Sequence, residues 1–263
     1  MVSVVVTIRN EAANLPRLLE SLSRQAAVRQ VVVVDAMSSD GSDEVVRGFA
    51  ASGRLGVQLI RRPCGRGEGR NIGVAACTEP LVAFTDGDCR PDEGWARALE
   101  RAWERDPMRV VAGRTVIEGK PAFSRLHRVE LEHKGMDVTW PSCNLAYPRA
   151  LLDKLGGFDP AFVTAEDIDL NFRAVSAGAR IVHAPDAIVH ARARDTLGGF
   201  LRQAYWNGYG RKQLTRKHGR LWHTYSMRNL LHVQGASPWA LLRMAAGFVG
   251  YVDAKLGRPA PHA

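Results

Sequence analysis

Two aspartates, Asp86 and Asp88, stand on either side of a single glycine at the end of the apolar run LVAFT. The run is short, β-prone and preceded by Pro80, so residues 81–85 predict a buried strand. Carboxylates this close repel each other unless a cation lies between them. The carboxyl end of a parallel strand is where α/β proteins bind ligands. A Mg²⁺ or Mn²⁺ ion held there together with substrate phosphates would supply the cation between the two carboxylates. Asp-Gly-Asp is also good turn chemistry, so the pair alone leaves both interpretations open.

Polar side chains also follow two other predicted strands. The first strand, residues 2–7, runs into a polar loop, and the second, residues 30–35, ends in an acid. One acid after a strand is commonly a helix cap. Loops after parallel strands, however, share one rim of the sheet, so the polar residues that follow these two strands and the strand before Asp86 can converge there. The residues of the first two sets are Thr7, Arg9, Asn10, Glu11 and Asp35.

A glycine-rich segment, residues 64–73 (CGRGEGRNIG), precedes a predicted helix. A dinucleotide-binding fingerprint would follow the first strand and carry an acid about 20 residues further on, whereas this segment follows the third strand. Arg66 and Arg70 favour an anion-facing role instead, with Arg70 near a helix N-terminus, where phosphate groups are stabilised.

A second acidic cluster, AEDIDL at residues 165–170, begins another predicted helix. Acids in the first turn stabilise a helix through its dipole, which is one explanation for Glu166, Asp167 and Asp169. The other explanation is catalytic, because a carboxylate at this position could act as a general base that deprotonates an acceptor hydroxyl.

The spacing of apolar residues predicts alternating strands and helices over the first 120 residues. The expected strands cover 2–7, 30–35, 57–60, 81–85 and 110–118, and the expected helices cover 14–25, 42–51, 69–76 and 92–104. This alternation predicts an α/β fold with a mostly parallel sheet flanked by helices. After residue 120 we expect helices over 148–155 and 165–177, and two short strands, 180–183 and 187–190, around Pro185.

The net charge of +9 is concentrated in the last part of the chain. Residues 192–263 contain 12 Lys and Arg but 2 Asp and Glu, whereas residues 1–191 contain 24 and 25. We therefore expect a nearly neutral domain over 1–191. A basic helical region, 192–263, would follow it.

The basic region combines charge with apolar residues at helical spacing. A basic amphipathic helix suits an anionic membrane surface, which would make the protein peripheral on the inner face of a membrane. The alternative is that the helices pack on the catalytic domain and their charges are solvated. Nucleic acid is not expected as a partner, since no recognition motif accompanies the charge. The basic residues concerned are Arg202, Arg211, Lys212, Arg216, Lys217 and Arg220.

The four cysteines, at positions 64, 77, 89 and 143, lack zinc-type spacing. The first residues show neither a basic leader nor a cleavage site, and no stretch reaches the roughly 18 uncharged apolar residues of a membrane-spanning helix. We therefore expect reduced thiols in a cytoplasmic protein.

As an ordered set, the motifs resemble glycosyltransferase family 2 over roughly residues 1–190. No single motif is specific, but their order and spacing match together. Val6 and Ile8 stand where the family commonly has Pro and Tyr or Phe, and these departures affect loop shape rather than chemistry. The matching segments are TIRNE at 7–11, Asp35 with SSDGS at 38–42, RNIG at 70–73, DGD at 86–88, GGFD at 156–159 and EDIDL at 166–170.

This resemblance implies a GT-A fold over 1–191, a catalytic domain with a nucleotide-binding half at about 1–120 and an acceptor half at about 121–191. It also implies a nucleotide-diphosphate sugar as donor, with UDP as the default nucleotide and GDP or dTDP open. It implies that the 7–11 loop and Asp35 hold the nucleoside and that Arg70 lies near the base and phosphates. It also implies that Asp86 faces the ribose and the metal, while Asp88 ligates Mn²⁺ or Mg²⁺.

On the acceptor side, the resemblance implies that Asp167 is the base and that Glu166 beside it shapes the acceptor site. His190 occupies a position where some relatives place a further metal or phosphate contact. One base without a protein nucleophile implies a single displacement with inversion, as in single-displacement glycosidases. The acceptor would be an alcohol, and a lipid-linked alcohol is one option.

Two other functions fit parts of the sequence. A sugar nucleotidyltransferase on a related α/β fold would make a nucleotide sugar rather than consume one, but it should carry a glycine-rich phosphate loop after the first strand, where this chain has none. A non-catalytic basic binding protein could retain the fold. Intact Asp86, Asp88 and Asp167 argue against such a loss of catalysis.

Overall fold

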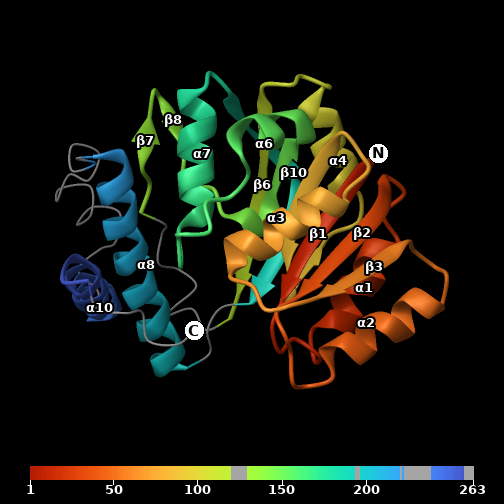
Figure 1. Cartoon of the computed structure of the whole chain (residues 1–263), viewed down its shortest axis with the longest axis horizontal. Coiled ribbons are helices and arrows are strands. Elements are labelled where there is room, and N and C mark those ends of the chain that lie inside the picture. The colour runs from red at the N-terminus through yellow and green to blue at the C-terminus, as the bar shows by residue number, and fades with distance from the viewer. Residues whose placement is uncertain (120–128, 193–195, 220, 222–237, 258–263) are drawn as a thin grey trace.

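The protein is described by a computed structural model that covers residues 1–119, 129–192, 196–219, 221 and 238–257 (Figure 1). Strands and helices alternate through the first half, as the apolar spacing predicts. The strands are β1 (Val2–Ile8), β2 (Val28–Asp35), β3 (Val57–Arg61), β4 (Leu81–Asp86), β5 (Cys89–Pro91), β6 (Arg109–Glu118), β7 (Glu132–His133), β8 (Met136–Asp137), β9 (Leu145–Pro148) and β10 (Arg180–Arg192). The helices are α1 (Leu15–Ser23), α2 (Ser42–Ala51), α3 (Arg66–Ala76), α4 (Trp95–Trp103), the 3₁₀ turn η1 (Ser142–Asn144), α6 (Arg149–Leu155), α7 (Glu166–Ser176), α8 (Leu197–His218) and α10 (Pro238–Lys255).

Eight of the strands form one mostly parallel sheet in the order β3-β2-β1-β4-β9-β6-β10-β5. β9 is antiparallel to both β4 and β6, so β6 and β10 again run parallel to β1. The carboxyl ends of β1, β2, β4, β6 and β10 therefore share one edge of the sheet, which is where ligands bind in open α/β folds. β5 follows the turn after β4 and pairs antiparallel with β10.

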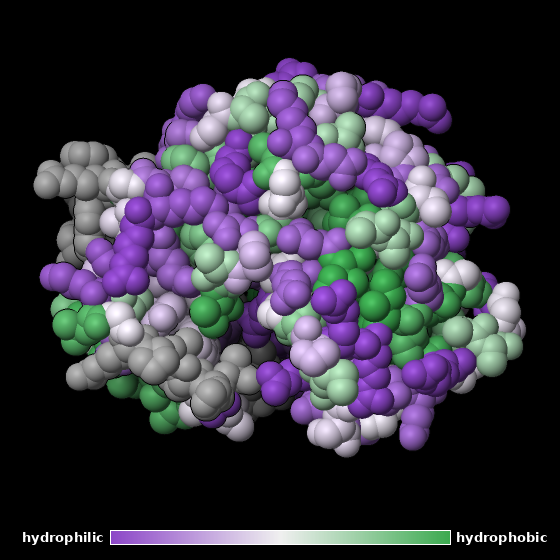
Figure 2. Space-filling view, viewed as in Figure 1, coloured by the Kyte–Doolittle hydropathy of each residue, from purple (hydrophilic) through white to green (hydrophobic). Residues whose placement is uncertain are grey.

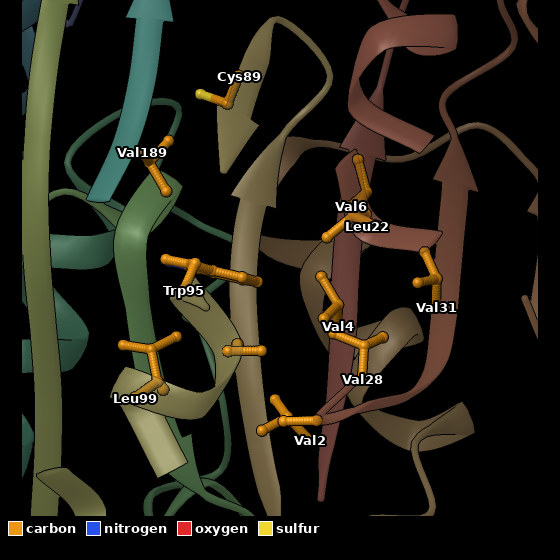
Figure 3. Close-up of a cluster of buried hydrophobic side chains, with 14 of the residues drawn as sticks. Val2, Val4, Val6, Leu22, Val28, Val31, Cys89, Trp95, Leu99 and Val189 are labelled. Atoms are coloured by element: carbon orange, nitrogen blue, oxygen red, sulfur yellow. The ribbon is translucent and has the colours of Figure 1, made fainter. Parts of the chain in front are cut away.

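The valines of β1 divide between the two faces of the sheet, because successive strand residues point to opposite sides. Val4 and Val6 pack with Leu22 of α1 and Trp95 of α4 on one face (Figure 3). Val5 packs on the other face, in the cluster that α3, α6 and α7 complete. Burial on both faces explains why polar residues enter these strands chiefly at their ends.

One long strand, β10, replaces the two short strands expected around Pro185. Its register against β6 shifts between Ala184 and Ile188, so the proline lies where the ladder is interrupted. A proline has no N–H to donate, and an interruption is the place where a strand tolerates it. The strand thus continues from Arg180 to Arg192, although its pairing with β6 is interrupted around Pro185.

The helices α8 and α10 pack against each other at very close range. A Cβ atom at Gly208 would overlap the backbone of Gly247, and a Cβ atom at Gly250 would overlap the carbonyl of Tyr205. Glycine at these positions allows the two backbones to touch. No helix in the described part of the chain has both the length and the apolar character required to cross a bilayer.

Candidate active site

The register of β1 against its two neighbours brings three predicted site residues together. Ile8 pairs with Asp35 of β2, and Thr7 pairs with Asp86 of β4. Arg9 follows as an exposed residue of the next loop. The strand ends therefore lie side by side on one rim, as their positions in the sequence predict.

The loops after β1 and β2 hold each other in shape. The Asn10 N–H donates to Ser38 Oγ (2.9 Å), and the Ser39 N–H donates to Asn10 Oδ1 (2.9 Å). The Glu11 N–H donates to Ser42 Oγ (2.9 Å). Asn10 has φ = 59°, a left-handed conformation that Asn adopts more readily than most residues. Glu11 therefore fixes the shape of the rim through its backbone, and Asn10 does so through both its backbone and its side chain.

Asp35 is fully buried at the end of β2. Its Oδ1 accepts hydrogen bonds from the N–H and the Oγ of Ser38, at 2.8 and 2.6 Å. Its Oδ2 accepts no hydrogen bond from the described residues, although Arg61 Nε lies 3.3 Å away. Oδ2 is thus paired with the charge of Arg61 and remains an acceptor without a hydrogen bond from the described residues.

Arg70 lies buried in α3 between two carboxylates, with 4% of its surface exposed. Its guanidinium donates to Asp86 Oδ1 (3.1 Å) and to Glu166, and it lies 5.5 Å from the centroid of the Phe158 ring. Burial opposes the charge, but the two carboxylates outweigh burial and raise the pKa of Arg70. This position differs from the anion-facing helix terminus expected from the sequence, because α3 begins earlier, at Arg66.

The glycines of the same segment bring α3 close to the rim. A Cβ atom at Gly69 would lie 3.2 Å from Thr7 Cγ2, and one at Gly67 would lie 3.3 Å from Phe158 Cβ. A Cβ atom at Gly73 would overlap the side chain of Val5. Close helix–sheet packing, rather than a loop around phosphates, therefore explains why this segment is rich in glycine.

Asp86 and Asp88 present carboxylates at the rim. The Asp86 side chain is 37% exposed even while Arg70 contacts it, and Asp88 is partly exposed. Among residues that the structure describes, no group of three or more His, Cys, Asp or Glu side chains is placed to hold a metal ion. Two accessible oxygen donors nevertheless fit Mg²⁺ or Mn²⁺, because these ions are commonly held by one or two carboxylates together with substrate phosphates.

His190 lies on β10 with both ring nitrogens beside carboxylates. Its Nε2 is 3.0 Å from Asp92 Oδ1, and its Nδ1 is 2.7 Å from Glu118 Oε1. In the ladder between β10 and β5, His190 pairs with Arg90. The structure thus pairs His190 with two carboxylates, and its metal role stays a prediction.

Asp167 is held at the start of α7 by backbone donors. The Ser142 N–H donates to its Oδ2 (3.0 Å), and the Ile168 N–H donates to its Oδ1 (2.8 Å). Burial and the neighbouring charge of Glu166 raise the pKa of Asp167 to about 6, against the opposing effect of Arg70. A carboxylate with this pKa is ionised at neutral pH and is a stronger base than an ordinary aspartate.

Ser142 is a site residue that sequence reasoning missed. It contacts Asp167 mainly through its backbone N–H, with its hydroxyl 3.4 Å from the same oxygen. Any residue type except proline supplies that N–H, so no sequence pattern marks it. Only the placement of η1 beside α7 reveals the contact.

Asp169 serves as an anchor rather than a base. Its fully buried carboxylate accepts from Arg173 Nε (2.9 Å) and lies 2.8 Å from Lys217 Nζ and 2.7 Å from His218 Nε2. Burial alone would raise the pKa of Asp169, but the hydrogen bonds from His218 and Lys217 outweigh it and lower the pKa to about 2. Asp169 therefore joins the C-terminal end of α8 to α7.

Residues 3–160 match the sequence model of the family described as Glycosyl transferase family 2. The chain is 30% identical over 227 residues to the Pre-mycofactocin glycosyltransferase of Mycobacterium tuberculosis, which covers 79% of the chain and 46% of that relative. It is 26% identical over 227 residues to Glycosyltransferase AglE of Haloferax volcanii, covering 81% of the chain and 73% of AglE. The chain thus spans just under half the length of the mycobacterial relative.

Two solved structures share the fold over nearly the whole chain. The mannosyltransferase PcManGT of Pyrobaculum calidifontis, in complex with GDP-Man and Mn²⁺, superposes with a TM-score of 0.66 at 22% identity and covers 99% of this chain and 76% of its own. TarS 1–349 of S. aureus, in complex with UDP-GlcNAc, gives a TM-score of 0.63 at 18% identity, covering 96% and 81%. The fold is GT-A, as the motifs imply.

We predict that Asp169→Asn lowers the free energy of unfolding by about 3 kcal/mol at pH 7, because it removes the charge of a fully buried carboxylate on which Arg173, Lys217 and His218 converge. The folded-state pKa of Asp169 lies below the ordinary value, so its stabilisation is complete at pH 7 and is lost only as the pH falls through about 2. Urea denaturation at pH 7 measures the change.

The matched control is Asp153→Asn. Asp153 is 64% exposed and lies 3.9 Å from Arg149 Nε, a surface pair expected to contribute less than about 1 kcal/mol. Equal stability losses for the two variants would contradict the anchoring role of Asp169.

Proposed function

The chain belongs to glycosyl transferase family 2, and we propose that it transfers a sugar from a nucleotide-diphosphate donor to an acceptor hydroxyl with inversion at the anomeric carbon. The observation that carries the proposal is the buried Arg70, which contacts Asp86 on the rim and Glu166 next to Asp167. Arg70 would thereby hold the donor site at the strand ends and the base on α7 at a fixed distance from each other. Family membership favours this transfer over the nucleotidyltransferase and the non-catalytic alternatives.

Asp35 Oδ2 accepts no hydrogen bond from the described residues, and it would be free for an N–H on the pairing edge of the donor's base if Arg61 moved aside. Uracil and guanine each present a ring N–H there, whereas cytosine and adenine present an unprotonated ring nitrogen, which a carboxylate would repel. A UDP-sugar remains the favoured donor and a GDP-sugar the alternative. PcManGT with GDP-Man and TarS with UDP-GlcNAc support both choices.

Asp86 and Asp88 would hold Mn²⁺ or Mg²⁺ against the donor diphosphate. The bound ion would supply Lewis-acid stabilisation of the departing diphosphate. Mn²⁺ in the PcManGT complex supports this assignment. Arg70 adds a fixed positive charge close to Asp86, and its burial keeps it from moving.

Asp167 would accept the proton of the acceptor hydroxyl. The acceptor oxygen forms a bond to the anomeric carbon as the bond to the diphosphate oxygen breaks, and the proton moves to Asp167. Since no protein nucleophile takes part, one displacement inverts the anomeric carbon. The hydrogen bonds from Ser142 and Ile168 hold both oxygens of Asp167 in position during the step.

We predict that nucleotide-sugar binding requires a divalent ion and Asp88. Asp88→Ala should abolish Mn²⁺-dependent binding of UDP or GDP in calorimetry, and the variant should remain folded because Asp88 lies on the rim. The control is Asp153→Ala, a surface change that should bind like the unmodified protein. Binding of equal strength in EDTA would contradict the metal assignment.

We predict that Asp167→Asn lowers turnover by about 10²–10⁴-fold, the usual range for a general base, while donor binding persists. Because the folded-state pKa is about 6, turnover of the unmodified protein should fall about tenfold per unit as the pH drops below 6. Initial rates measured from about pH 4.5 to about pH 8 give both effects. A flat profile with a near-normal rate for Asp167→Asn would move the role to Glu166.

Basic residues of α8 are engaged within the protein, so α8 is not the element that we expect to contact a membrane. In α8, Arg211 donates to the carbonyl of Val129 (2.6 Å), Arg216 donates to the carbonyl of Lys255 (3.1 Å), and Lys217 lies 2.6 Å from Asp159. These contacts favour the alternative in which α8 packs on the rest of the protein. Arg220 lies outside the described residues.

We propose that α10 makes the peripheral contact with an anionic membrane surface on the cytoplasmic side. It exposes large apolar side chains, and Figure 2 shows hydrophobic atoms at the outer edge of the molecule in that region. Such a contact would suit a lipid-linked acceptor. The exposed apolar residues are Leu241, Leu242, Phe248, Val249 and Leu256.

We predict that the protein co-sediments with phosphatidylglycerol vesicles at low salt and not with phosphatidylcholine vesicles. High salt should weaken the interaction, because each Lys or Arg near an anionic surface contributes about 1 kcal/mol that salt screens. Phe248→Ser should lower binding, whereas Ile117→Ser, which changes an exposed apolar residue on β6, should not. A protein that stays in the supernatant at low salt contradicts the membrane proposal.

A further inference from the structure

One face of α8 changes from exposed to buried along its length. Gln203, Asn207, Gly210 and Leu214 recur at a spacing of four, three and four residues, so they lie on one side of the helix. Gly210 and Leu214 are buried, whereas Gln203 and Asn207 are exposed. On this face, the second half of α8 therefore lies against the rest of the protein and the first half is open, whereas Phe200 and Ala204 on the other side of the first half are buried. Figure 2 shows the surface hollowed between this region and the part built on the sheet.

The point where contact begins is next to the proposed base. A Cβ atom at Gly210 would lie 2.8 Å from Thr164 Cγ2 and 2.8 Å from Ala165 Cβ. Ala165 is the residue before α7, and Glu166 and Asp167 follow it directly. The exposed part of this face, which precedes Gly210, thus ends beside the N-terminus of α7.

Polar contacts fix α8 in this position. Gln213 Nε2 donates to the carbonyl of Ala161 (3.0 Å), and the Val163 N–H donates to Gln213 Oε1 (3.3 Å). One turn further on, Lys217 Nζ lies 2.6 Å from Asp159 and 2.8 Å from Asp169. The open half of α8 is therefore carried by a half that is held rigidly to α7.

Trp206 lies at the open end of this arrangement, four residues before Gly210 and so on the same side of the helix. Its half-buried ring is braced by two tyrosines: Tyr205 at 5.5 Å between centroids and Tyr209 at 5.7 Å. Tyr205 is itself fixed, because its hydroxyl lies 3.1 Å from Asp253 of α10. The indole is thus a positioned surface rather than a freely rotating side chain.

The neighbours of Trp206 are polar. Arg202 and Gln203, at four and three residues before it, lie beside it on the helix surface, and Asn207 follows it. All three are exposed. An aromatic face bordered by amide and guanidinium groups matches a pyranose ring, which has an apolar C–H face and hydroxyl groups at its edge.

We propose that Trp206 is the acceptor platform and that the acceptor is a pyranoside. The C–H face of the sugar would stack on the indole, Gln203 and Asn207 would bind its hydroxyl groups, and one further hydroxyl would face Asp167. This inference rests on the proposed function for the identity of the acceptor. The binding of the sugar to Trp206 can be measured without turnover.

The first test observes Trp206 directly. The six tryptophans of the chain are labelled with 5-fluorotryptophan, and the Trp206→Phe variant assigns the resonance of Trp206 in the ¹⁹F spectrum. Methyl β-D-glucopyranoside and methyl α-D-mannopyranoside are the probes, and glycerol is the control polyol without a stacking face. We expect at least one pyranoside, and not glycerol, to shift the Trp206 resonance. If both pyranosides leave it unmoved, the proposal is wrong.

The second test uses sugar transfer to the pyranoside that binds. Trp206→Ala should raise the KM for this acceptor about tenfold while the KM for the donor changes less than about twofold, and Trp206→Phe should recover most of the loss. Trp239→Ala, in α10, is the matched control and should change neither constant. Equal effects on both KM values would indicate a merely structural role and overturn the proposal.

The two tests separate this inference from the proposed function. A shifted Trp206 resonance without turnover from any nucleotide sugar would retain the sugar platform and reject the transfer. Turnover with an unmoved Trp206 resonance would retain the sugar transfer and reject Trp206 as the sugar platform.

Discussion

The site depends on one buried cation. Arg70 has almost no exposed surface and contacts two carboxylates that come from opposite sides of the site, Asp86 at the end of β4 and Glu166 at the start of α7. A buried guanidinium is tolerable only when its charge is matched and its donors are bonded. The protein therefore cannot shift the rim relative to α7 without leaving Arg70 unpaired. The same constraint explains the glycines at 67 and 69, since α3 must come close enough for Arg70 to reach both partners.

The sheet fixes the positions of Asp35 and Asp86 relative to each other. Because β1 and β2 are buried on both faces, their registers are set by packing, and Asp35 and Asp86 end at matching levels beside β1. The antiparallel β9 separates β4 from β6, and η1 leads into it. The same connection places the Ser142 N–H against Asp167. The topology thus positions both the rim proposed to bind the nucleotide and the backbone that holds Asp167, the proposed base.

The parts of the site that the sequence predicts are those determined locally. Asp35 and the pair at 86 and 88 follow apolar strands, so their place on the rim follows from strand order alone. The burial of Arg70 could not be predicted, because its partner Glu166 is 96 residues away in the sequence. The glycine-rich segment likewise suggests a loop until the nearness of Val5 shows that it is a closely packed helix. The single bent β10 escaped prediction because Pro185 normally ends a strand.

The basic C-terminal region is not merely an attachment to a neutral domain. Its side chains pair with acids of the preceding part: Lys217 lies beside the half-buried Asp159 and the buried Asp169, and His218 also contacts Asp169. Asp169 is two residues from Asp167 on α7, so α8 stabilises the helix that carries the proposed base. The boundary expected at residue 191 marks a change in charge composition, whereas the contacts of α8 with α7 and with Asp159 join the two sides of it. Since the same helix overhangs the hollow beside α7, we infer that the part of the chain that sets the charge balance also forms one wall of the acceptor site.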